Sequence, residues 1–157
     1  MKRTFGHKIG IISDTHGLIR QRVVKSFKDV DLIVHAGGVG KPEVLETLQS
    51  IARVYPVRGN VDGGKWADNL PFTEVVKVGQ TYLYILHDLN TLDLDPVAAG
   101  FNAVISGHSH IPKIEERNGV LFLNPGSAGP KRLKYLASIA FLSVNGVSID
   151  TEIVELK

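Results

Sequence analysis

Apolar residues in the first third of the chain fall into short continuous runs, separated by stretches with helix-like spacing. Lys8–Ser13, Asp31–His35 and Arg53–Val57 are apolar and rich in β-branched residues, which predicts strands buried on both faces. Leu18–Phe27 and Pro42–Ala52 carry apolar residues three and four positions apart, which predicts helices. The order strand–helix–strand–helix–strand with short connections predicts a parallel sheet with right-handed crossovers.

Hairpins dominate the rest of the chain. The pairs Gly79-Gln80, Asn118-Gly119 and Asn145-Gly146 lie between apolar runs and predict tight turns. A short helix is expected over Leu94–Ala99. The strands expected here are Thr73–Val78, Tyr82–Leu86, Ala103–Ser106, Ile111–Arg117, Val120–Leu123, Ser138–Val144 and Ser148–Val154. The pattern predicts an α/β fold in which two β-sheets pack face to face with helices outside. No repeat or linker divides the chain, so residues 1–157 are expected to form a single domain.

Composition narrows the class of protein. The hydrophobic and charged fractions, 43% and 22%, are those of an ordinary globular chain. No apolar run approaches the ~20 residues of a membrane span, and the run Ile9–Ile12 is too short for a secretory signal. The absence of cysteine excludes disulfides and thiolate metal sites. We therefore expect a cytoplasmic protein without a membrane partner.

Charge gives no clear indication of nucleic-acid binding. The net charge of +2 is too small to argue for such a partner. The one basic cluster, Lys131-Arg132-Leu133-Lys134, is interpreted as solvated surface, with an approach path for phosphate as the minority interpretation.

Polar residues gather where predicted strands end. In open α/β sheets the carboxyl ends of the strands form the ligand crevice, so these residues are expected to lie together. The residues concerned are Asp14, His16, His35, Asn60, His87, His108 and His110. Scattered histidines would not be expected to show this placement.

The spacing of these residues fits a metal site. Asp14 and His16 are two positions apart, as are His108 and His110, so each pair would point the same way in an extended exit from a strand. Imidazole and carboxylate together suit Zn, Mn, Fe, Co or Ni. Each residue also has a simpler interpretation: Asp14 could cap the following helix, Asn60 could be a turn residue, and His87 could be a satisfied buried histidine. Their joint placement favours the metal site.

The ordered motifs resemble the calcineurin-like metallophosphoesterases, and above all their small bacterial and archaeal phosphodiesterase branch. The motifs are Asp14-Thr15-His16, His35-Ala36-Gly37, Gly59-Asn60-Val61-Asp62, His87, Gly107-His108-Ser109-His110 and Asn124-Pro125-Gly126-Ser127. The resemblance covers residues 8–154 and implies a four-layer αββα sandwich of two mixed β-sheets flanked by helices.

The resemblance also implies a catalytic site with one or two divalent metal ions, of Mn, Zn, Ni, Fe or Mg. Asp14, His16 and His110 would hold the first, and a second group would hold the other: Asn60, His87 and His108. The reaction implied is hydrolysis of a small phosphate ester, with a phosphodiester as the expected substrate, by metal-activated water. Asp14, His16, Asn60 and His108 are the residues to which the resemblance gives catalytic roles. Homo-oligomerisation stays open.

Two departures from the family pattern bear on activity. The family has a bridging aspartate where this chain has Gly38, so we expect a weakened second metal site. Asp88 follows His87 where the family usually has glycine, and it is either a substitute ligand or a solvated turn acid. His35 and the turn Asn124–Ser127 are expected near the site without binding metal.

Two other functions compete with the phosphoesterase. One is a catalytically impaired protein-interaction scaffold, like the retromer subunit that has this fold and lacks parts of the metal constellation. The other is a mononuclear iron site, since two histidines and a carboxylate also describe oxygenases. Retention of six ligand types favours the enzyme over the scaffold, and the fold resemblance disfavours the oxygenase.

Overall fold

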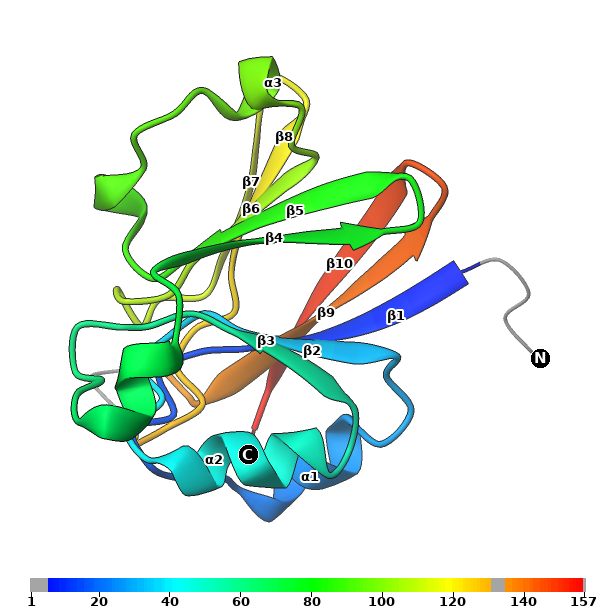
Figure 1. Cartoon of the computed structure of the whole chain (residues 1–157). Helices are drawn as coiled ribbons and strands as arrows, with labels where there is room; N and C mark the ends of the chain where they lie inside the picture. Colours follow the sequence, from blue (N-terminus) through cyan, green and yellow to red (C-terminus); the bar gives the residue numbers. More distant parts are fainter. Residues whose placement is uncertain (1–5, 131–134, 157) are drawn as a thin grey trace.

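Two five-stranded sheets pack face to face in the computed structural model, which describes residues 6–130 and 135–156 (Figure 1). The first sheet has the order β10-β9-β1-β2-β3 and the second the order β4-β5-β6-β8-β7. Both sheets are mixed, as the family resemblance implied. The basic cluster at 131–134 lies outside the described residues.

The first sheet brings three strand ends level with one another. Its strands are β1 (Gly6–Ile12), β2 (Leu32–His35), β3 (Arg53–Pro56), β9 (Ser138–Asn145) and β10 (Ser148–Glu155). The first three are parallel, and Ile12 pairs with His35, which pairs with Pro56. The loops that follow these three strands therefore leave the sheet at the same end, where the carboxyl ends of the strands lie.

The second sheet also aligns the carboxyl ends of its parallel strands. It consists of β4 (Thr73–Val78), β5 (Thr81–Leu86), β6 (Ala103–Ile105), β7 (Lys113–Arg117) and β8 (Val120–Asn124). Ile85 pairs with Ile105, which pairs with Leu123, so β5, β6 and β8 end side by side.

Apolar side chains between the sheets form the main core, which includes Ile11, Val34, Ile85 and Leu123. Burial of each such side chain stabilises the fold by roughly 1.5–3 kcal/mol. The two sheets are thereby fixed against each other, and their loop-bearing ends lie on the same side of the molecule (Figure 1).

The outer faces of the two sheets are covered unequally. Helices α1 (Gln21–Ser26) and α2 (Pro42–Gln49) lie on the first sheet, and Phe27 and Leu48 pack into its outer core. Among the described residues, the second sheet is covered by the segment that contains η2 (Leu89–Thr91) and α3 (Pro96–Ala99). The predicted four layers are present, but this last layer is one irregular segment with two short helical turns.

The predicted strands all form, whereas helix boundaries differ. Helix α2 ends at Gln49 rather than Ala52, because the last turn tightens: the N–H of Ile51 donates to Leu48 O, three residues back. Helix α3 begins at Pro96 because the Asp95 side chain caps it. The short helices η1 (Lys65–Asn69) and η2 were not predicted.

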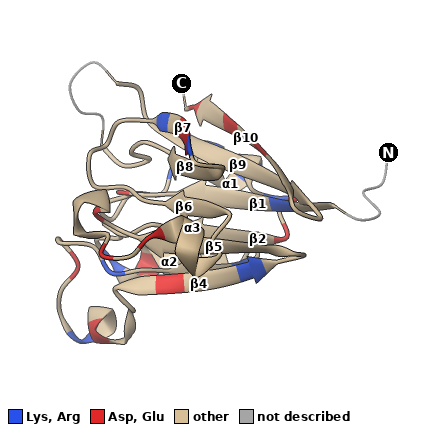
Figure 2. Ribbon diagram, turned by 90° about the horizontal axis from the view of Figure 1, so that it is seen from above, with Lys and Arg blue, Asp and Glu red and all other residues tan. Residues whose placement is uncertain are grey.

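Charged residues are interspersed over the described ribbon rather than gathered on one side (Figure 2). In the described part of the chain no helix is long and apolar enough to cross a membrane.

Candidate metal centre

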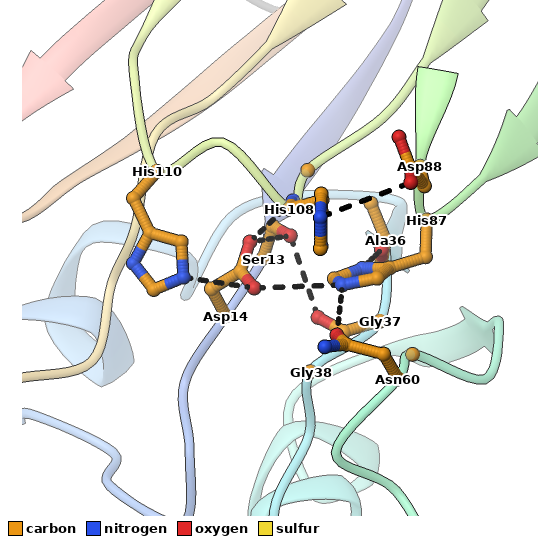
Figure 3. A network of polar contacts seen from close by, with 12 residues as sticks. Ser13, Asp14, Ala36, Gly37, Gly38, Asn60, His87, Asp88, His108 and His110 are labelled. Atoms are coloured by element: carbon orange, nitrogen blue, oxygen red, sulfur yellow. Dashed lines mark hydrogen bonds and ion pairs between the residues drawn. The ribbon is translucent and has the colours of Figure 1, made fainter. Parts of the chain in front are cut away.

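The predicted ligand residues come together where the strand ends of the two sheets meet (Figure 3). Asp14 and His16 follow β1, and Asn60 lies in the loop after β3. His87 follows β5, while His108 and His110 lie between β6 and β7. The structure therefore gathers all six residues from both sheets into one site.

Asp14 stands at the middle of this group and is only 1% exposed. Its Oδ2 accepts hydrogen bonds from the Ser13 hydroxyl (2.7 Å) and from the backbone N–H of His108 (3.0 Å). These bonds fix the carboxylate plane and leave Oδ1 turned toward the imidazoles (Figure 3).

Oδ1 of Asp14 faces three imidazole nitrogens. The Nε2 atoms of His110, His16 and His87 lie 3.4, 3.6 and 3.8 Å away, respectively. The ligand atoms of Asp14, His16 and His110 all lie within 4.8 Å of one another, as ligands of one ion must. Nε2 of His16 is buried and has no hydrogen-bond partner among the described residues. A buried nitrogen in this state is costly unless something binds it, so a divalent cation fits this group.

The other three residues form a second group beside the first. Nδ1 of His87 lies 2.7 Å from the carbonyl oxygen of Ala36, which can only accept, so Nδ1 carries the proton. In the neutral ring Nε2 is then an acceptor, and it lies 3.1 Å from Oδ1 of Asn60. The rings of His87 and His108 are 5.2 Å apart between centroids. Acceptors that face one another in this way are stabilised by a cation between them.

The sequence left open whether Asp88 is a substitute ligand or a turn acid, and its contacts in the structure have features of both. Its Oδ1 accepts the backbone N–H of Asn90 and so caps η2. Its Oδ2 points back toward the site and lies 3.8 Å from Nε2 of His108 (Figure 3). The residue is thus a turn acid that also presents one carboxylate oxygen to the second group.

The backbone at the ligand pairs is not extended, contrary to our expectation. Asp14, His16, His108 and His110 have positive φ angles of 55°, 49°, 71° and 65°. Tertiary hydrogen bonds impose this conformation: the N–H groups of Asp14 and His16 donate to Gly37 O and Gly38 O, each at 2.9 Å. As a result His110 joins Asp14, whereas His108 turns toward His87. Left-handed residues other than glycine cost of order 1–3 kcal/mol each, and such strain concentrates at functional sites.

The simpler interpretation of Asp14 does not describe its contacts, because helix α1 begins after Arg20 with no side-chain cap. His87 is buried and both of its ring nitrogens lie beside polar atoms, Ala36 O and Asn60 Oδ1, so the interpretation as a satisfied buried histidine stays open.

His35 is fully buried and has both ring nitrogens occupied. Nδ1 accepts the N–H of Gly37 (3.1 Å), and Nε2 lies 3.0 Å from the Thr15 hydroxyl, which donates to Val39 O. Burial lowers the pKa of His35 from 6.5 to about 4. The ring is therefore neutral near pH 7 and supports the two loops around the site, with no nitrogen left for a metal.

The glycine at position 38 leaves space that Asp14 fills. Gly38 has φ +72°, and a β-carbon added to it would stand 2.6 Å from Oδ1 of Asp14. The Gly38 loop is held by a residue to which the sequence analysis gave no role. Asp62 is buried, and its carboxylate accepts the N–H groups of Gly38, Val39, Gly40 and Gly59. An acid within a glycine-rich turn is the sequence signal that could have indicated this.

The turn Asn124–Ser127 braces the other loops, as predicted. The Asn124 amide donates to Gly107 O (2.9 Å), directly before His108. The Ser127 hydroxyl donates to Asp14 O (3.0 Å).

The sequence of this chain is similar to those of known proteins. The sequence model of the calcineurin-like phosphoesterase superfamily domain matches residues 8–146. A probable metallophosphoesterase of Methanocaldococcus jannaschii is 37% identical over 149 residues, which cover 87% of this chain and 75% of that protein. A phosphodiesterase of the same organism is 26% identical over 163 residues, covering 92% and 93% of the two chains.

The fold is also that of Vps29, whose solved structures superimpose on this chain. Vps29 from Chaetomium thermophilum superimposes with a TM-score of 0.84 at 20% identity, over 96% of this chain and 89% of that one. This likeness concerns the fold alone.

Proposed function

Because this chain belongs to the calcineurin-like phosphoesterase superfamily, we propose that it is a metal-dependent phosphodiesterase acting on a small phosphate ester. One relative bears the name phosphodiesterase, which supports this choice among phosphoesters. The proposal takes residues 1–157 as one catalytic domain and includes the cytoplasmic location expected from composition.

One observation carries the proposal: a buried carboxylate oxygen, Asp14 Oδ1, faces the Nε2 atoms of three histidines from different loops. Folding alone gives no reason to collect these groups around one acid, since burial of charged and polar groups is costly without partners. A divalent cation supplies the missing partner. The donor set suits Mn, Zn, Ni or Fe, and Mg less well.

Asp14, His16 and His110 would hold one ion, and Asn60, His87 and His108 would hold a second. When bound, such ions polarise a phosphoryl group and bring the pKa of water toward neutrality. The protein residues set the ligand positions. Ser13 and the His108 N–H orient Asp14, and Ala36 O fixes the His87 tautomer.

The two groups should differ in affinity. The first contains a full carboxylate, whereas the second has a neutral amide and two imidazoles, with Asp88 at its edge. With glycine at position 38, two cations close together would be poorly neutralised. We therefore propose tight binding of one ion, weaker binding of a second, and reduced turnover.

The alternative is a protein-interaction scaffold. Gly38 in place of a bridging acid and the shared fold with Vps29 favour it. The intact donor groups around Asp14 oppose it, because a scaffold would not need them.

The test is a metal titration of activity. The full chain is stripped with a chelator, and hydrolysis of bis(p-nitrophenyl) phosphate is followed while Mn²⁺, Zn²⁺, Ni²⁺, Fe²⁺ or Mg²⁺ is restored separately. Hydrolysis that disappears on stripping and returns with at least one ion supports the proposal. Protein that binds metal but hydrolyses neither this diester nor p-nitrophenyl phosphate would favour the scaffold.

A further inference from the structure

The outer face of the second sheet is only partly covered. Leu89, Leu92, Leu94 and Phe101 of the covering segment pack over the β5, β6 and β8 side of this face. Strand β7 lies beyond them at the sheet edge. A pocket remains between the segment and β7.

This pocket has a volume of about 360 Å³ and adjoins the candidate metal centre. His108 of the second ligand group and Asp88 beside it are among the lining residues. Pockets for small ligands have volumes of this order and combine apolar walls with a few polar groups. A phosphoryl group held at His108 would therefore have its ester substituent at the entrance to this pocket.

Apolar residues lie on three sides of the pocket. Phe122 lies on the β8 side, Leu89 on the covering segment and Ile111 on the loop that leads into β7. Ile111 is 40% exposed, so its side chain is accessible to a ligand in the pocket. These apolar residues can contact an apolar or aromatic group.

Glu115 pairs with both cationic residues of β7 in the pocket lining. Lys113, Glu115 and Arg117 alternate along β7 and so share one face. Glu115 lies 3.1 Å from Lys113 Nζ and accepts two hydrogen bonds from Arg117, whose guanidinium stacks 4.5 Å from the Phe122 ring centroid. Arg117 and Lys113 lower the pKa of Glu115 to about 2, so the acid stays ionised. Both cations share one acid, so this face of β7 keeps one net positive charge.

We infer that this pocket binds an aromatic ester substituent of the phosphodiester substrate, with its ring against Ile111. The inference rests on the proposed function, since it takes the phosphoryl group to lie at the metal centre. It adds a substrate class: phosphodiesters of an aryl or base-bearing group, in preference to simple alkyl diesters.

The test measures binding by calorimetry to the full, Mn²⁺-loaded chain with three probes: inorganic phosphate, methyl phosphate and phenyl phosphate. The unmodified protein should bind phenyl phosphate about tenfold more tightly than methyl phosphate, from burial of the ring. Ile111→Ala should reduce that ratio to about threefold or less, while affinity for inorganic phosphate stays unchanged.

Ile114→Ala is the matched control. Ile114 lies on β7, three residues after Ile111, and is 47% exposed but does not line the pocket, so this variant should keep the full ratio. In a second variant, Asn90→Trp, the larger side chain at the pocket lining should also remove the preference; Val97→Trp, on the same segment outside the pocket, should not.

The outcomes distinguish a failure of the pocket assignment from a failure of the proposed function. Equal affinity for methyl and phenyl phosphate, with inorganic phosphate bound, would overturn the pocket assignment and leave the phosphodiesterase proposal standing. An aryl preference that survives both pocket variants would also overturn the assignment. Failure to bind any of the three probes would contradict the proposed function, and the assignment with it.

Discussion

Oδ1 of Asp14 lies 2.6 Å from the point where a β-carbon on Gly38 would stand (Figure 3). The carboxylate of Asp14 therefore occupies the space beside a loop at which the family pattern has a second acid. The same oxygen faces His16 and His110 of one ligand group and His87 of the other. In this chain a single acid is placed between both groups.

Restoring the acid should have opposite effects without and with metal. Without metal, Gly38→Asp should lower the free energy of unfolding by about 2 kcal/mol, because the residue keeps φ +72° and its side chain displaces the Asp14 carboxylate. With excess Mn²⁺ the variant should bind more metal than the unmodified protein and hydrolyse a chromogenic diester faster, since two acids neutralise two cations. Thermal unfolding, metal-to-protein ratio and turnover are measured on the same samples.

Gly38→Asn controls for shape, since it adds a similar side chain without the charge. It should destabilise the metal-free protein without raising metal content. If Gly38→Asp binds two metals and stays as slow as the unmodified chain, the missing acid is not what limits hydrolysis.

Acid should destabilise the metal-free protein through His35. Burial lowers the pKa of His35 from 6.5 to about 4, so between these values the unfolded chain takes up a proton that the folded chain does not. The contribution is complete above pH 6.5 and is lost as the pH falls toward 4, by roughly 3 kcal/mol in total. Urea unfolding of His35→Gln should show lower stability at pH 7 and a flatter dependence below pH 6.5. His7→Gln, at an exposed position, should keep the slope of the unmodified protein; an unchanged slope in His35→Gln would contradict the assignment.

Asp62 should contribute strongly to stability, although it is not one of the predicted metal ligands. Asp62→Asn replaces one of two oxygens that together accept four backbone N–H groups of the loops around Gly38 and Gly59. The loss should be about 2–4 kcal/mol, since a buried donor loses its partner. Asp68→Asn, which removes only an exposed ion pair with Arg58, should change stability by less than about 1 kcal/mol. Chemical denaturation of both variants gives the comparison.

Asp88 should act on the second cation only. Asp88→Asn keeps an oxygen that can cap η2 but removes the charge that faces His108. Calorimetric titration with Mn²⁺ should show the weaker binding event reduced by about tenfold and the tighter one unchanged. Loss of the tighter event instead would mean that Asp88 belongs to the first group.

The fold was predictable because its signals are local. The Asn118-Gly119 pair fixes the β7–β8 hairpin, and the continuous apolar runs at β1 and β2 identify buried parallel strands. Gathering of the site residues followed from the parallel topology, which aligns strand ends.

The geometry within the site was not predictable in this way. The left-handed backbone at Asp14 and His16 depends on carbonyl groups of Gly37 and Gly38, more than twenty residues away. Likewise, the bracing role of Asp62 and the pocket beside β7 arise from contacts between loops, for which a single sequence has no periodic pattern.

The most direct test of the account is manganese binding by Asp14→Asn, which keeps the shape of the central side chain and removes its charge. The unmodified protein should bind at least one Mn²⁺ tightly and hydrolyse bis(p-nitrophenyl) phosphate. Asp14→Asn should lose both Mn²⁺ affinity and turnover by at least about a hundredfold. Asp150→Asn, at an exposed position on β10, should match the unmodified protein in both. Unchanged Mn²⁺ affinity in Asp14→Asn would contradict the central claim that this carboxylate holds the catalytic metal.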